Sequence, residues 1–307
     1  MGRRKGGQPI NGWIAIDKPL GMTSTAVVTK VRRMTDAAKV GHGGTLDPLA
    51  SGILPIALGE ATKTVAYVMD GAKSYRWQVT WGEARSTDDG EGEVVATSEN
   101  RPSLADIEAV LPRFLGEIEQ VPPAYSAVKI GGQRAYALAR AEQSVELRPR
   151  IVRIDSFTMI ESTPESATFE VGCGKGAYIR SLARDLALAL DTVGYVSSLR
   201  RTRCGPFDEI NAISLDMLEE FGHSAASANL VLPVETVLDD IPALALTEDE
   251  ARRLQNGQSL SVLRLAALNP HTSISAGVTV RAMAEERLVA LARIDGAELR
   301  PIRVLNL

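Results

Sequence analysis

The sequence predicts an α+β protein that ends in a small β-rich unit. Residues 75–81 alternate between apolar and polar side chains, which is typical of a strand with one buried face. Residues 103–115 and 179–190 carry apolar side chains at the spacing of one helix face. Residues 278–304 form short alternating segments separated by turn residues, which favours strands. These patterns predict helices and strands mixed in a large domain, followed by a smaller domain of strands.

The other predicted elements follow in chain order. Thr23 and Ser24 can cap a helix that runs through Arg33, because their side-chain oxygens can accept from the free amides of its first turn. The short apolar run at 53–59 predicts a buried strand or turn. Further strands are expected over 12–19, 150–157 and 167–173, a loop or hairpin over 83–93, a short helix over 214–220, and a strand followed by a helix over 243–257. The expected organisation is a flexible basic segment over 1–10, a large domain over 11–235 and a small domain over 240–307.

The composition is that of an ordinary folded protein. Of 307 residues, 45% are hydrophobic and 23% are charged. No apolar run approaches the roughly 20 residues that cross a bilayer, and the basic N-terminal segment lacks the apolar stretch of a secretory signal. We therefore expect a cytoplasmic protein with no membrane partner. The two cysteines lack CxxC spacing and the three histidines lie far apart, so we expect no metal site and a metal-free mechanism.

The net charge is −4, yet positive charge is gathered in two segments. Residues 1–63 hold nine Lys and Arg against four Asp and Glu, and residues 172–205 hold six against two. Such clusters suit a face that contacts phosphate groups of a nucleic acid. A chance clustering of solvated charges is the alternative.

A glycine-rich stretch, GHGGTLDPLASG at 41–52, holds a single carboxylate, Asp47. Its four glycines allow backbone conformations and close approaches that other residues do not. Pro48 biases Asp47 towards an extended or turning backbone. The spacing alone favours an ordinary turn, with a loop shaped for a ligand as the alternative.

This stretch, together with the residues that follow it, resembles the catalytic motif of the TruB family of tRNA pseudouridine synthases. The resemblance implies that Asp47 is the catalytic residue and that His42 lies beside the target nucleotide, where it positions the substrate. Gly43 stands where a threonine is usual, and we expect only local effects from this difference. Arg85-Ser86-Thr87 stands where Thr-Asp-Thr is often found, so the role of that loop stays open.

Further segments resemble motifs of the same family, and the resemblance assigns residues in them to substrate binding. These residues are Lys18, Tyr75, Tyr125, Lys129, Arg180 and Leu199. Tyr75 is expected to stack on the target uracil and to be placed for proton transfer, and Arg180 to pair with Asp47. Ordinary structural roles stay open for Lys18 as a solvated side chain and for Tyr125 as a buried one.

The segment at 199–207 carries a leucine and three arginines. By resemblance, Leu199 lines the uracil pocket, and Arg200, Arg201 and Arg203 contact the RNA backbone. Positive charge at this segment is thus expected to face the substrate.

The resemblance implies a mixed or antiparallel-sheet pseudouridine synthase catalytic domain over 11–235 and a β-barrel-like PUA RNA-binding domain over 240–307. The expected partner is the T-arm of tRNA, bound by a monomer. The expected reaction isomerises the uridine at position 55 after this base is flipped out. Because the reaction gains no electron or group overall, no cofactor is expected. The route of attack, at C1′, at C6 or through a glycal, stays open.

Two functions from other classes are alternatives. One is an RNA-binding or tRNA-folding chaperone in which catalysis is secondary. The other is a carboxylate-based glycoside hydrolase, which would normally need a second placed carboxylate. No motif in this sequence provides that second carboxylate.

Overall fold

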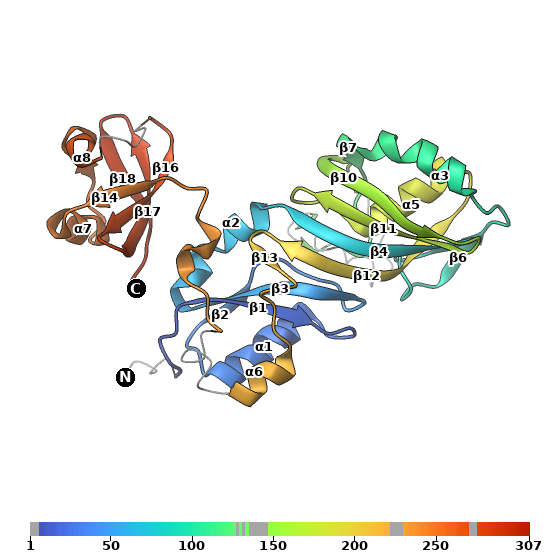
Figure 1. Cartoon of the computed structure of the whole chain (residues 1–307), viewed down its shortest axis with the longest axis horizontal. Coiled ribbons are helices and arrows are strands. Elements are labelled where there is room, and N and C mark those ends of the chain that lie inside the picture. Colours follow the sequence, from blue (N-terminus) through green and yellow to red (C-terminus); the bar gives the residue numbers. More distant parts are fainter. Residues whose placement is uncertain (1–5, 127–128, 131–132, 135–146, 222–229, 270–274) are drawn as a thin grey trace.

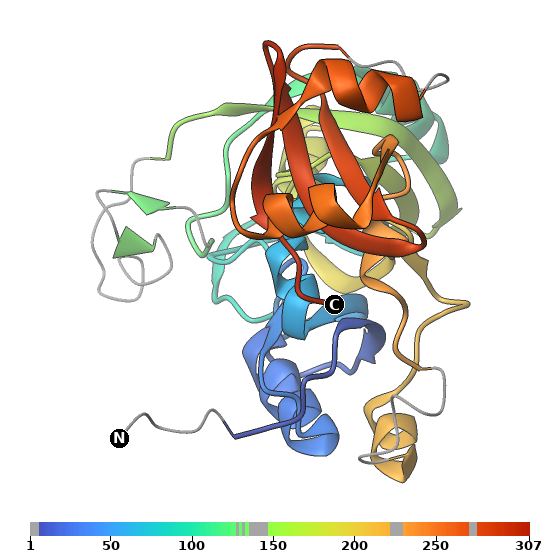
Figure 2. The same ribbon diagram turned by 90° about the vertical axis from the view of Figure 1, so that its left-hand side faces the viewer.

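The computed structural model describes residues 6–126, 129–130, 133–134, 147–221, 230–269 and 275–307. Two separate β-sheets organise these residues, a large one built between residues 12 and 208 and a small one built between residues 243 and 304 (Figures 1 and 2). The mixture of helices and strands confirms the predicted α+β class. In the described ranges, no helix is long and apolar enough to cross a membrane.

The large sheet is mixed and, within the described residues, contains nine strands. Its main path runs in the order β1 (Gly12–Lys18), β3 (Ala50–Leu58), β12 (Gly194–Cys204), β4 (Lys73–Trp81), β11 (Ser166–Cys173), β10 (Arg150–Ser162) and β7 (Gly116–Gln120). Two short strands extend it, β2 (Val40–His42) beside β3 and β13 (Phe207–Asp208) beside β12. The pair of β3 and β12 is parallel, with residues 50–52 aligned to residues 199–201, and the other pairs are antiparallel. This parallel pairing joins β1, β2 and β3 to the rest of the sheet.

Helices cover the large sheet in two groups that enclose separate hydrophobic cores. The helices are α1 (Ser24–Thr35), α2 (Val65–Asp70), α3 (Leu104–Val110), α5 (Ile179–Ala189) and α6 (Leu215–Phe221), with 3-10 turns η1 (Gly59–Lys63), η2 (Leu111–Phe114) and η4 (Val234–Val237). One core lies between α1, α6 and strands β1 and β3, and the other lies between α3, α5 and strands β4, β10 and β11 (Figure 1). Tyr75 and Leu199 pack against both cores. The two cores therefore meet at these two side chains.

The small sheet has its own core and is joined to the large sheet by a further apolar cluster. Its strands lie in the order β14 (Ala243–Leu246), β16 (Thr279–Ala284), β17 (Arg287–Asp295), β18 (Glu298–Val304) and β15 (Leu260–Ser261), with α7 (Glu248–Gln255) and α8 (Val262–Leu268) beside them (Figure 1). Leu288 and Leu305 pack in one cluster with Trp13 of β1. The Asn306 amide also donates to the Glu60 carboxylate at 2.8 Å. The end of the described chain is thus held against η1, which directly follows β3.

Local sequence patterns predicted many of these elements. The alternating residues 75–81 lie in β4, where Trp77 and Trp81 are buried as expected. The Thr23 hydroxyl accepts from the Ala26 amide at the start of α1, which confirms the predicted cap. The three alternating segments after residue 278 form β16, β17 and β18. Two further antiparallel strand pairs lie outside the two sheets. They are β5 (Glu83–Arg85) with β6 (Val94–Thr97) and β8 (Lys129–Ile130) with β9 (Gln133–Arg134).

One predicted helix was too long. The helix expected over 103–115 stops at Val110 and continues as the 3-10 turn η2. Pro112 lies at the start of that turn, has no amide proton, and clashes with the carbonyl one turn earlier in an α-helix. Leu104 is one of the apolar residues whose spacing predicted a buried helix face, yet it is 55% exposed.

The catalytic-motif loop after β2 packs closely against α2. The Gly43 amide donates to the Pro55 carbonyl at 2.8 Å. A Cβ atom at position 43 would lie 2.8 Å from Val68 Cγ1, closer than such atoms approach each other. Val68 is 1% exposed and fills the room that a larger residue at 43 would need. A threonine at position 43 would therefore collide with Val68 unless one of the two segments moved.

We expect Gly43→Thr to lower the free energy of unfolding by about 1–3 kcal/mol, because the added atoms overpack the contact with Val68. Val68→Ala alone should also destabilise, because it leaves a void. The double variant should be more stable than the sum of the two single effects predicts, as measured by urea unfolding. Strictly additive effects would show that the two positions do not share one space.

Candidate active site

A cavity of about 270 Å³ opens where the two cores meet. Several parts of the chain line it, among them residues 44–47 of the glycine-rich loop, Tyr75 of β4, Ser126, Leu199 and Arg201 of β12, and residues 176–180 at the start of α5. The loop, the two strands and the helix are far apart in sequence. The fold thus gathers Asp47, Tyr75, Arg180 and Leu199 of the predicted site around one space.

The backbone on both sides of Asp47 is held by Lys18 at the end of β1 and by Ser24 at the start of α1. The Ser24 hydroxyl accepts from the Leu46 amide at 2.8 Å and donates to the Leu46 carbonyl at 3.0 Å. Lys18 Nζ donates to the Met22 carbonyl at 2.6 Å and reaches the Pro48 carbonyl at 3.5 Å. These contacts fix the residues before and after Asp47 and leave its side chain free to face the cavity.

Lys18 is fully buried, whereas the sequence predicted a side chain that either binds substrate or is solvated. Burial lowers the pKa of its ammonium group to about 8, against the opposing attraction of Asp47. With its donors on backbone carbonyls, Lys18 holds the loop together. Its assignment to substrate binding stays a prediction.

Arg201 ties the same loop to β12 from the other side. Its guanidinium is 2% exposed and donates to the carbonyls of Ile53 at 2.8 Å and Gly44 at 3.2 Å. These donors are thus used within the protein, and the expected contact of Arg201 with the RNA backbone stays a prediction. Arg200 makes a bidentate pair with Asp17, both bonds at 2.9 Å. Arg203 is exposed, so its expected contact with the RNA backbone also stays a prediction.

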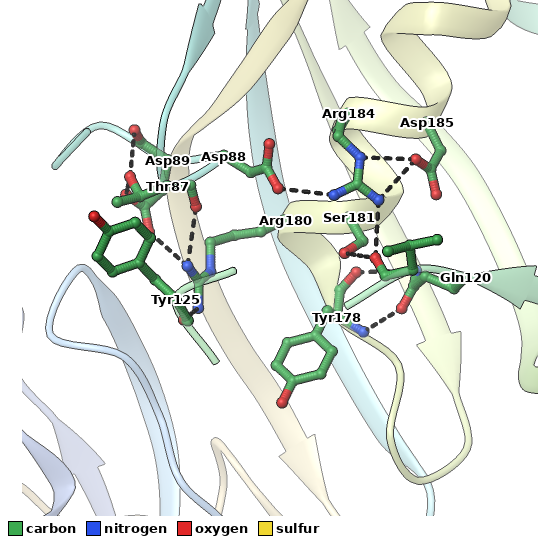
Figure 3. Close-up of polar contacts among 11 residues, drawn as sticks. Thr87, Asp88, Asp89, Gln120, Tyr125, Tyr178, Arg180, Ser181, Arg184 and Asp185 are labelled. Carbon is green, nitrogen blue, oxygen red and sulfur yellow. Dashed lines mark hydrogen bonds and ion pairs between the residues drawn. The ribbon is translucent and has the colours of Figure 1, made fainter. Parts of the chain in front are cut away.

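The Asp47 carboxylate pairs with Arg180, as the resemblance implies. The distance between Arg180 Nη2 and Asp47 Oδ2 is 2.9 Å, and the Asp47 side chain is 40% exposed while that of Arg180 is 5% exposed. The Arg180 guanidinium also donates to the carbonyls of Thr87 and Tyr125, each at 2.9 Å (Figure 3). The buried arginine is therefore immobilised on several sides, and it presents one face to a carboxylate that substrate can reach.

A second carboxylate, Asp89, faces the same guanidinium at 3.4 Å and was not anticipated from the sequence. Asp89 is 5% exposed and accepts from the Thr87 hydroxyl and the Glu91 amide. The neighbouring Asp88 pairs with Arg184 at 3.0 Å, one helical turn after Arg180 (Figure 3). The sequence did contain a signal for these pairs, since it has two adjacent acidic residues and two arginines spaced one helical turn apart. The loop whose role was left open thus anchors α5 to the site.

Tyr75 and Leu199 form the apolar wall of the cavity. Burial raises the pKa of Tyr75 to about 12, although the nearby Arg201 charge opposes this shift. The phenol therefore keeps its proton at neutral pH and can donate a hydrogen bond. Lys73, two residues earlier on β4, also lines the cavity, and its ammonium donates to the carbonyls that end α2.

The remaining predicted residues are not among those that line the cavity. His42 lies in β2 and accepts from the Gly44 amide at 3.4 Å. Burial lowers its pKa, with a further lowering by Arg201, so its imidazole is neutral at neutral pH. Tyr125 contributes its carbonyl to Arg180. Lys129 lies in β8, and its side chain is outside the described part of the structure.

The geometry gives a fixed, accessible carboxylate beside a neutral phenol. A carboxylate so placed can act as a nucleophile or as a general base. Among the residues that the structure describes, no three His, Cys, Asp or Glu side chains are grouped as metal ligands.

Comparisons with known proteins point to one family. A model described as TruB family pseudouridylate synthase (N terminal domain) matches residues 32–179, and one described as tRNA pseudouridylate synthase B C-terminal domain matches residues 180–239. The chain is 60% identical to tRNA pseudouridine synthase B of Rhodospirillum rubrum, over 100% of both chains. It is 52% identical to the protein of the same name from Gluconacetobacter diazotrophicus, over 99% of this chain and 100% of the relative.

Solved structures share the fold. A chain in the crystal structure of a Cbf5–Nop10–Gar1 complex is 29% identical, with a TM-score of 0.70 over 96% of this chain and 84% of that chain. A chain in an H/ACA RNP bound to a substrate RNA containing 2′-deoxyuridine gives a TM-score of 0.73 over 100% of this chain and 92% of that chain. At 24% identity, this second likeness concerns the fold alone.

We expect the burial of Lys18 to make stability depend on pH in one direction. Between its folded pKa of about 8 and its ordinary value of 10.5, the unfolded chain binds a proton that the folded chain has lost. This group therefore makes the free energy of unfolding rise with pH in that window, and below it the full cost of burying the charge is present. Urea unfolding of wild type and Lys18→Met between about pH 7 and pH 10 isolates this dependence. The stability of wild type relative to the variant should increase with pH; a constant difference contradicts the burial of a charged Lys18.

Proposed function

The chain belongs to the TruB family of pseudouridylate synthases, and on that premise we propose that it converts the T-loop uridine at position 55 of tRNA to pseudouridine, with Asp47 as the catalytic residue. That the protein is a tRNA pseudouridine synthase follows from its 60% identity over the full chain. The observation that carries the role of Asp47 is its pairing with a buried arginine at the wall of the cavity.

The reaction breaks the bond between ribose C1′ and uracil N1, turns the detached base, and joins C1′ to C5. Atoms and electrons balance without a co-reactant, because the C5 proton leaves and N1 gains one. Asp47 acts either as a nucleophile or as the base that removes a ribose proton. Arg180 fixes the direction of this carboxylate, and a fixed reacting group lowers the entropic part of the barrier.

The target base must leave its stack to enter the cavity, which costs a few kcal/mol. In our proposal Tyr75 stacks on the uracil and Leu199 closes the apolar side, since both side chains line the cavity. The protonated Tyr75 hydroxyl supplies a donor near the reacting atoms. A snug apolar wall also keeps the detached base in place between the two steps.

For contacts with phosphate groups we propose exposed cations that lie outside the 199–207 segment. Lys30, Arg32 and Arg33 on α1, and Lys39 after it, are all exposed. We propose that they bind the tRNA backbone and that the small sheet is a PUA-like RNA-binding domain. The enzyme is proposed to act as a cytoplasmic monomer on the T-arm.

We expect Asp47→Asn to lower pseudouridine formation at least about a hundredfold, because a neutral amide is neither nucleophile nor base. Binding of tRNA should be largely retained, since the cavity shape is unchanged. The measurement is incubation with unmodified tRNA, followed by mapping of pseudouridine at nucleotide resolution. An Asp47→Asn enzyme of near wild-type activity sinks the assignment, and product at another nucleotide sinks the choice of position.

We expect Asp89→Asn to lower kcat about ten- to a hundredfold with little change in KM, because Arg180 loses one of its two carboxylate partners and aims Asp47 less well. Asp88→Asn is the matched control from the same loop, since Asp88 pairs with Arg184 instead. Single-turnover kinetics on tRNA compare the two variants. Equal losses of kcat would show that the loop acts only by its overall folding.

A further inference from the structure

Most polar side chains that line the cavity have partners within the protein. Lys73 and Arg201 donate to backbone carbonyls, and Arg180 pairs with Asp47. The buried hydroxyl of Ser126 has no such partner among the described residues. Ser126 lines the cavity and is 2% exposed.

Ser126 lies next to the reacting end of the cavity. The carbonyl of the preceding residue, Tyr125, accepts from Arg180 Nη2 at 2.9 Å. The same nitrogen lies 2.9 Å from the Asp47 carboxylate. Arg180 Nε is a second buried atom without a partner among the described residues. Unpaired polar groups therefore gather on the wall that holds the Asp47–Arg180 pair.

A buried hydroxyl without a partner is costly, and native proteins pair nearly all such groups. A hydroxyl can both donate and accept, so it can match either kind of polar atom on a ligand. Ser126 lines the cavity. A molecule bound in the cavity can therefore supply the hydrogen-bond partner that the Ser126 hydroxyl lacks. The nucleotide that reacts with Asp47 is such a molecule.

We propose that Ser126 is a substrate-binding residue whose hydroxyl forms a hydrogen bond with the target nucleotide and so positions C1′ against Asp47. The proposal rests on the proposed function, because the occupant is the flipped-out uridine. The shared chemistry is a polar atom of that nucleotide, either the ribose 2′-hydroxyl or a uracil oxygen or N3–H. No covalent step involves Ser126.

The test compares Ser126→Ala with Ser181→Ala and Ser126→Thr in single-turnover kinetics on unmodified tRNA. Ser181 is the matched control, since its buried hydroxyl donates to the Val121 carbonyl, which keeps a second donor in Arg184. Ser126→Ala should lower kcat/KM about tenfold, the loss of one hydrogen bond. Ser126→Thr keeps the hydroxyl and should recover part of this loss, while Ser181→Ala should match wild type.

The nucleotide atom is identified with tRNA altered at the target position alone. Binding is measured with 2′-deoxyuridine, 2-thiouridine, 4-thiouridine or 3-methyluridine at that position, for wild type and Ser126→Ala. The difference in affinity between wild type and Ser126→Ala should disappear for the one substrate that lacks the partner atom, because the two changes then remove the same hydrogen bond.

Two results overturn the proposal. Unchanged kcat/KM in Ser126→Ala would show that the hydroxyl does not contact the substrate, and the same loss in Ser181→Ala would assign the effect to folding. Wild-type enzyme without activity on tRNA would instead refute the proposed function itself. Activity of wild type and its loss in Asp47→Asn, together with unchanged Ser126→Ala, would refute only the role of Ser126.

Discussion

The parallel pairing of β3 with β12 is the constraint on which the site depends. It aligns residues 50–52 with residues 199–201 and is the place where the two halves of the large sheet meet. Gly52 has φ +97, and a Cβ atom there would lie 2.2 Å from the Arg201 carbonyl oxygen, so only glycine allows the strands to approach. The register puts Leu199 beside the strand that Asp47 leads into. Without this contact, Asp47 and the apolar wall at Leu199 would not face the same cavity.

Local pattern and family resemblance together predicted most of the secondary structure and the pair of Asp47 with Arg180. These features depend on short-range spacing or on motifs that can be read in one stretch. The site also depends on contacts that no spacing reveals. Arg201 reaches the carbonyl of Gly44, a residue 157 positions away, and Asp89 meets Arg180 only because the loop after β5 lies against the start of α5. Such contacts depend on how the chain folds in space. The sequence therefore indicates which residues are important but not which residues contact each other.

The distribution of Lys and Arg along the sequence was a poor predictor of which residues are free to contact RNA. The cluster at 172–205 looked like a surface for phosphates, yet several of its arginines have protein partners. Arg180 and Arg201 are buried, and Arg184 and Arg200 pair with carboxylates. A guanidinium can bridge backbone carbonyls and carboxylates in a fixed planar geometry, which makes arginine suited to such enclosed positions. The cations of α1 have the exposure that an external partner requires.

The cluster that joins the two sheets bears on how the protein is made. Trp13 and Ile53 of the large sheet share this cluster with Leu288 and Leu305. A ribosome adds residues from the N-terminus at about 5–20 per second, so the first two side chains emerge many seconds before the last two. During that interval the part of this face that Leu288 and Leu305 cover has no partner from the small sheet. Apolar side chains exposed in this way make a nascent chain prone to aggregate, so the order of synthesis leaves the two strands at risk until the small sheet has been made.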